Sequence, residues 1–202
     1  MQRLDGPREK ILGEWSSESV LDTTYDNGYR MILTAYERRA YNEDRTYDDE
    51  WHTLIKLEIS FRDGSVRMYY YIHGNSKNSW SANNGLYVDS TMTTSFKDEV
   101  APGNAIADKD MQTGKMRHYG LSNFPKEYDP KVIKMLQETY NAYGQSWKET
   151  CNEKKKVVYK ITSLTDNQII FKDNDGSKYT LKRGNIMSPR IQQMIAEGKA
   201  LR

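Results

Sequence analysis

The stretch Trp51-His-Thr-Leu-Ile-Lys-Leu-Glu-Ile-Ser-Phe61 carries the clearest structural pattern in the sequence. Its odd positions hold Trp, Thr, Ile, Leu, Ile and Phe, whereas its even positions are mostly polar. A repeat of two residues predicts a β-strand with one buried and one wet face, as in an antiparallel sheet or barrel wall. Asp63-Gly64 follows and predicts a hairpin turn, because glycine adopts the positive φ that such turns need.

Sequence patterns typical of β-strands occur on both sides of this stretch. A first strand is expected to begin at Ile11-Leu-Gly-Glu-Trp15, and the polar segment 40–50 is expected to be a loop or an exposed strand extension. Further strands are expected at 29–37, 66–73, 86–96, 156–164, 168–172 and 177–182. In the 86–96 strand, Leu86, Val88, Met92 and Phe96 are in phase.

Residues 97–155 interrupt the strand pattern. Asp129-Pro130 predicts the start of a helix, with Asp as N-cap and Pro in the first turn. Apolar residues then recur at helical spacing to Tyr143, and the helix ends there or continues past Trp147. Ser188-Pro189 predicts a second, short helix. The expected organisation is a lead at 1–10, a β domain at 11–187 with its insertion at 97–155, and a helical tail at 188–202.

Composition narrows the class of protein. The 202 residues carry a net charge of +2, too small to indicate nucleic-acid binding by itself. With Cys151 as its single cysteine, the chain has no internal disulfide, and no apolar run is long enough for a membrane helix. The first ten residues contain no signal-peptide core. The sequence therefore fits a cytoplasmic protein, or a periplasmic or extracellular one whose signal has been removed.

Two short motifs resemble those of a known family. A Gly-x-Trp in the first strand is the hallmark of lipocalins and the wider calycin superfamily, and here it is Gly13-Glu14-Trp15. In that family an Arg after the last barrel strand covers the Trp, and here the last strand ends at Arg183. The chain thus resembles the lipocalin-like domains of bacterial proteins. The resemblance implies an up-and-down antiparallel β-barrel of about eight strands, mainly β in class, with Trp15 and Arg183 paired at its closed end.

Strand phase, combined with this barrel, predicts the residues that line its interior. These candidates for ligand contact are Met31, Leu33, Ile55, Leu57, Met68, Tyr70, Ile72, Leu86, Val88, Tyr159, Ile161, Phe171 and Leu181. Small barrels can equally fill their interior with side chains, so the same residues fit a packed core.

The sequence offers no catalytic constellation. HExxH, CxxC, Gly-x-Ser-x-Gly, Walker and GxGxxG patterns are all absent, and we expect neither an enzyme nor a cofactor or metal site. His52 and His73 are expected on outer strand faces, exposed. The basic clusters Arg38-Arg39 and Lys154-Lys155-Lys156 lack a supporting nucleic-acid motif, so no nucleic-acid partner is expected.

Two functional classes fit these observations. In the first, the barrel holds a small apolar or amphipathic ligand. In the second, the barrel is packed and the protein binds a protein partner through outward tyrosines, such as Tyr69 and Tyr71, and through the 97–155 insertion. The sequence defines neither the ligand nor the oligomeric state.

Overall fold

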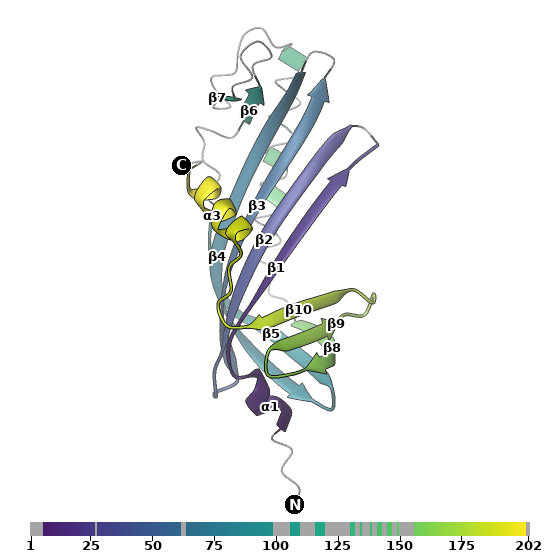
Figure 1. The fold of residues 1–202 in the computed structure, drawn as a ribbon, viewed down its shortest axis with the longest axis vertical. Coiled ribbons are helices and arrows are strands. Elements are labelled where there is room, and N and C mark those ends of the chain that lie inside the picture. The colour runs from purple at the N-terminus through teal and green to yellow at the C-terminus, as the bar shows by residue number, and fades with distance from the viewer. Residues whose placement is uncertain are drawn as a thin grey trace, which may run out of the picture.

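Eight antiparallel strands form a closed up-and-down barrel (Figure 1). The computed structural model describes residues 6–26, 28–61, 64–98, 106–109, 116–119 and 156–200, together with nine helical positions between 130 and 149. The elements are α1 (Gly6–Ile11), β1 (Gly13–Thr24), β2 (Tyr29–Tyr41), β3 (Thr46–Phe61), β4 (Gly64–Asn83), β5 (Leu86–Asp98), β6 (Ile106–Lys109), β7 (Met116–Tyr119), β8 (Lys156–Leu164), β9 (Gln168–Lys172), β10 (Lys178–Arg183) and α3 (Pro189–Ala200).

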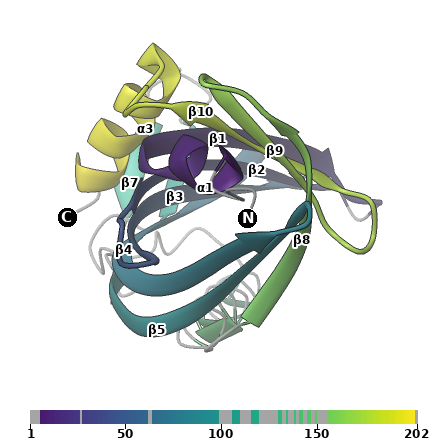
Figure 2. The ribbon, with the colours of Figure 1, turned by 90° about the horizontal axis from the view of Figure 1, so that it is seen from below.

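The barrel strands follow one another in chain order. β1 to β5 form a meander, β8 joins β5, and β9 and β10 lead back to β1, so that β1 pairs with both β2 and β10. Viewed from below, the strands curve around a ring (Figure 2). This is the fold class that the sequence predicts. The short β6–β7 hairpin lies outside the ring and pairs with β4.

Unequal strand lengths divide the barrel into two halves. β4 has 20 residues and β10 has 6, which at about 3.3 Å per residue are roughly 66 Å and 20 Å long. Within the described residues, β10 pairs with β1 at Trp15 and Ser16. The ring is therefore closed at the lower end, where β8 to β10 lie, and β1 to β4 rise far above it (Figure 1).

Several boundaries differ from the sequence prediction. Residues 6–11 form the helix α1 rather than a lead, and β2 and β3 extend through most of the 40–50 segment around a turn at 42–45. Of the charged residues that suggested a loop there, Glu43, Asp44 and Arg45 lie in the turn, and Asp49 faces the interior of the barrel. The described positions from Pro130 to Glu149 are all helical, so helical residues occur beyond Tyr143. Asp129 and the basic residues Lys154 and Lys155 lie outside the described residues.

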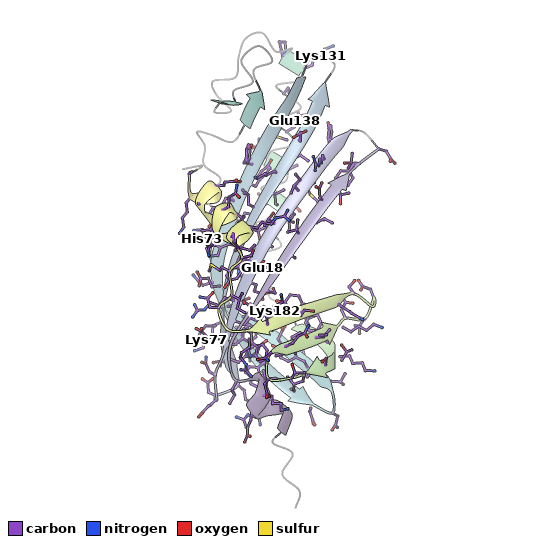
Figure 3. The ribbon with its side chains drawn as sticks, viewed as in Figure 1. Glu18, His73, Lys77, Lys131, Glu138 and Lys182 are labelled. Atoms are coloured by element: carbon purple, nitrogen blue, oxygen red, sulfur yellow. The ribbon has the colours of Figure 1, made fainter. Side chains whose placement is uncertain are left out.

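Alternation places polar side chains on the outer wall. Glu18, His73, Lys77 and Lys182 all belong to the outward phase of their strands (Figure 3). The helix α3 packs against this wall over β2, β3 and β4. Its Ile191 and Met194 are buried there in a cluster with Tyr36, Leu54 and Tyr71.

Candidate functional site in the barrel interior

The lower end of the barrel is sealed by Trp15 and Arg183. The guanidinium carbon of Arg183 lies 3.9 Å from the centroid of the fully buried Trp15 ring, in the contact that the sequence predicts. The indole Nε1 of Trp15 donates to the carbonyl of Ile11 at 2.6 Å, which attaches α1 to the Trp15–Arg183 pair. Gly13 has a φ of 101°, and a Cβ there would lie 3.2 Å from Arg183 Nη1. Glycine at position 13 therefore allows the positive φ of the backbone and leaves room for the Arg183 side chain.

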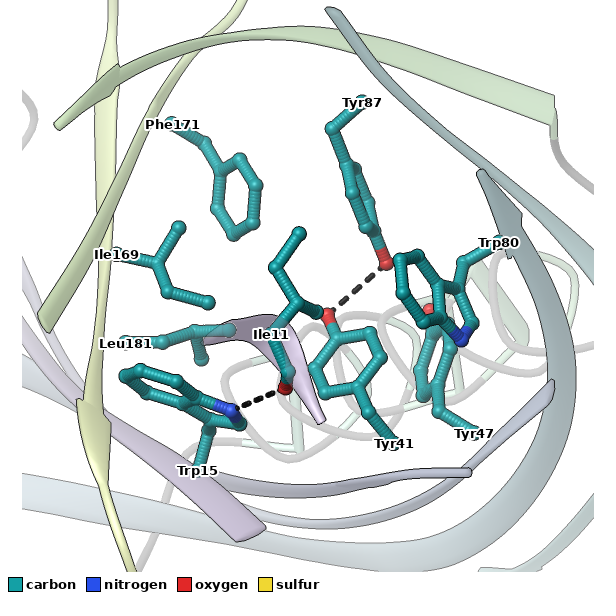
Figure 4. Packing of buried hydrophobic residues seen from close by; sticks show 9 residues of the cluster. All are labelled: Ile11, Trp15, Tyr41, Tyr47, Trp80, Tyr87, Ile169, Phe171 and Leu181. Atoms are coloured by element: carbon teal, nitrogen blue, oxygen red, sulfur yellow. Dashed lines mark hydrogen bonds between the residues drawn. The ribbon is translucent and has the colours of Figure 1, made fainter. Parts of the chain in front are cut away.

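An aromatic cluster packs around Trp15 at this end of the barrel, and we call it the aromatic layer (Figure 4). The hydroxyls of Tyr41 and Tyr87 hydrogen-bond to each other at 2.9 Å, and the Tyr87 and Phe171 ring centroids are 4.7 Å apart. Four lining candidates belong to this packed layer: Phe171 and Leu181 are fully buried in it, and Tyr159 and Ile161 pack against it. The lower interior is thus a core.

A layer of charged side chains lies next to the aromatic core. Glu37 and Arg39 on β2, Asp49 on β3 and Asp89 on β5 face the interior, in phase with Tyr41, Tyr47 and Tyr87 on the same strands. Arg39 Nε donates to Glu37 at 2.5 Å, and its Nη1 lies 3.7 Å from Asp89 Oδ2. We call these four residues the charged layer.

Tyrosines complete the charged layer. The Arg39 guanidinium lies 5.2 Å from the ring centroids of both Tyr47 and Tyr179. The Tyr179 hydroxyl donates to Glu37, and the Tyr47 hydroxyl donates to Asp89 at 3.3 Å. Burial, opposed by Arg39, raises the pKa of Tyr179 well above its ordinary value. These phenols therefore remain protonated donors at neutral pH.

The pKa values of the Glu37 and Asp49 carboxyls are shifted in opposite directions. Burial raises the pKa of Asp49 well above its ordinary value, and the neighbouring charge of Glu37 raises it further. Burial acts the same way on Glu37, but the charge of Arg39 and hydrogen bonds from Tyr179, Arg39 and Asp49 outweigh it and lower the Glu37 pKa. These directions favour the proton on Asp49 and the negative charge on Glu37.

Apolar side chains cover the same inner face above the charged layer. Leu21 on β1 lies opposite Leu33 on β2, and Met31 follows one step further up. Leu21 is 48% exposed, and Met31 and Leu33 are half-buried. The other lining candidates on this upper face, Ile55, Leu57, Met68, Tyr70 and Ile72, are buried. The inner face thus changes from aromatic core to charged layer to apolar wall.

Two of the lining candidates are wrong. Leu86 and Val88 lie on the outer face of β5, opposite Lys160 and Val158, and Leu86 is 50% exposed. Their neighbours Tyr87 and Asp89 point inward instead. The aliphatic residues seemed to mark the inner face, but this part of the interior is polar and aromatic. Leu86 lines an open groove of about 520 Å³ beside the β9–β10 turn.

The expected outer tyrosine patch is covered by the protein's own helix. Tyr71 is fully buried beneath α3, and Tyr69 packs against the same cluster. His52 is on the outer face as predicted, but only 7% of it is exposed. Its Nδ1 is 2.8 Å from the Tyr71 hydroxyl, and burial lowers its pKa. Tyr69 and Tyr71 therefore do not form an exposed patch, and most of the 97–155 insertion lies outside the described residues.

Sequence reasoning missed the charged layer. Arg39 was assigned with Arg38 to a basic surface cluster, but only Arg38 faces outward, where it pairs with Glu14 and Glu50. The available signal was strict strand parity: Arg39 and Glu37 have the same phase as Leu33. Charge obscured that phase, because charged residues are rarely buried.

No group of His, Cys, Asp or Glu side chains in the described ranges is arranged to hold a metal ion. No helix among those residues is long and apolar enough to cross a bilayer. Comparison of the sequence with protein-family profiles and with curated proteins finds no match. The functional assignment therefore depends on the geometry of the barrel interior.

Proposed function

We propose that this protein is a non-enzymatic binding protein that holds a small apolar or amphipathic ligand on the upper inner face of its barrel. The supporting observation is the half-exposed apolar wall of Leu21, Met31 and Leu33, in phase with the charged layer below. Binding sites of this kind combine an apolar lining with a few placed polar groups. The apolar part of the ligand contacts the wall, and its polar end faces the charged layer.

Neighbouring residues on β1 allow a matched test. Leu21 faces inward and is 48% exposed, whereas Val20 faces outward and is 42% exposed. Binding of the neutral dye Nile red is measured by fluorescence for the full chain and for Leu21→Lys and Val20→Lys. Leu21→Lys should weaken binding by about tenfold or more, because a charge replaces a buried apolar contact. Val20→Lys should bind as the unmodified protein does.

Equal effects of the two substitutions would place the dye elsewhere, and an absence of dye binding would contradict the binding function. Native mass spectrometry of the purified protein adds an independent readout. A co-purifying mass that disappears in Leu21→Lys and persists in Val20→Lys supports the proposed site.

A further inference from the structure

We infer that the ligand is an organic amine, with an apolar body on the wall and a protonated nitrogen against the charged layer. The inference rests on the proposed binding function, because it assigns the chemistry of the ligand's polar end. Its basis is the imbalance within the charged layer, where Glu37 and Asp89 both pair with the single guanidinium of Arg39 and Asp49 adds a third carboxyl group.

The guanidinium of Arg39 is already used within the protein. It contacts Glu37 at 2.5 Å, the Tyr41 hydroxyl at 3.3 Å and Asp89 at 3.7 Å. Its carbon also lies 5.2 Å from the Tyr47 and Tyr179 rings. An anionic ligand would have to displace carboxylates that already satisfy this cation, and it would add negative charge beside them.

The side chains of Glu37 and Asp89 are more exposed than that of Arg39. The Glu37 side chain is 19% exposed and the Asp89 side chain 11%, against 9% for Arg39. The Oδ1 atom of Asp49 is shielded from solvent and accepts no hydrogen bond among the described residues. A buried acceptor without a donor is unfavourable, so the layer lacks a hydrogen-bond donor rather than an acceptor.

A protonated amine supplies what this layer lacks. Its N–H groups can donate to Glu37 and Asp89, and its charge offsets the negative charge that Arg39 does not neutralise. The faces of Tyr47 and Tyr179 already accommodate one cation. Arg39 keeps the pKa of Glu37 low despite its burial, and the Glu37 side chain is more exposed than that of Asp89, so Glu37 is the principal contact for the ligand nitrogen.

Three probes with the same apolar body test this inference on the full chain. Titration calorimetry compares 2-naphthylmethylamine, 2-naphthylmethanol and 2-naphthoate. We expect the amine to bind about tenfold more tightly than the alcohol, as for a charge pair in a partly buried site, and the carboxylate to bind least tightly. If Nile red binds but the amine has no advantage over the alcohol, the amine inference fails while the binding function stands. If neither dye nor probes bind, both fail.

Glu37→Gln and Asp49→Asn form a matched pair of variants. Glu37→Gln removes the anion and should reduce the amine-to-alcohol affinity ratio by about tenfold. Asp49→Asn replaces a carboxyl whose pKa burial raises with a neutral amide and should leave the ratio within about twofold. Equal effects on the ratio would overturn the assignment of Glu37. Circular dichroism checks folding, and Asp89→Asn, which should also lower the ratio, replaces Glu37→Gln if that variant does not fold.

Discussion

Arg183 joins three separate parts of the chain at the closed end. Its guanidinium covers Trp15 and donates to the carbonyls of Lys10, Leu12 and Asp166. A lysine ammonium is too compact to donate to all three carbonyls, and it lacks the planar group that stacks on the indole. We expect Arg183→Lys to lower the free energy of unfolding by about 2 kcal/mol, measured by urea denaturation.

Arg30→Lys is the matched control for this prediction. Arg30 pairs with Asp22 on an exposed surface, where ion pairs contribute about 0–1 kcal/mol. Equal losses in the two variants would mean that Arg183 is an ordinary surface residue. The sequence predicts the Trp15–Arg183 contact because the motif names both partners, whereas no motif marks Glu37 or Asp49, whose positions depend on strand phase alone.

At the scale of elements, α3 depends on a close approach to the barrel wall. A Cβ at Gly198 would lie 2.2 Å from Cδ2 of the buried Tyr71 ring. Alanine normally stabilises a helix relative to glycine by about 1 kcal/mol. Gly198→Ala should instead lower the melting temperature and speed hydrogen exchange across Pro189–Ala200, because the helix must move away from the wall.

A higher melting temperature in Gly198→Ala would show that helix propensity outweighs this contact. Leu54→Ala, in the same cluster, should also speed exchange in α3 by leaving a cavity beneath it. The sequence predicts α3 from Ser188-Pro189 and its apolar spacing. It does not predict what α3 covers, because a Tyr in the outward phase of β4 has the same pattern whether water or a helix lies over it.

For the whole molecule, buried tyrosines set the response to alkali. Burial raises the pKa of Tyr36 to about 12, and burial likewise raises the pKa of Tyr41, Tyr47, Tyr87, Tyr159 and Tyr179. In the unfolded chain these phenols lose protons near 10.0, whereas the folded protein holds them. Stability is therefore complete below that pH and falls above it, by up to about 1.4 kcal/mol per pH unit for each phenol.

Urea denaturation at increasing pH, with tyrosinate absorbance recorded in parallel, measures this effect. The folded protein should show a tyrosinate signal well below that of the unfolded chain until it denatures. Titration of all 15 tyrosines near 10.0 without unfolding would contradict it. Alternation in the sequence predicts the strands, and the resemblance through Gly-x-Trp and Arg183 implies the barrel. Neither predicts that phenols and charged side chains fill its middle, because inward positions are expected to be aliphatic.

The pairing of β1 with β10 has a kinetic consequence. Trp15 meets Arg183, so the ring closes through residues far apart in the chain. During synthesis β1 to β5 emerge long before β10, and within the barrel β1 and β5 then each have an edge without its final neighbour. Such non-local closure slows folding. The interval before Lys178–Arg183 is made is thus the period when the nascent chain is most exposed to aggregation.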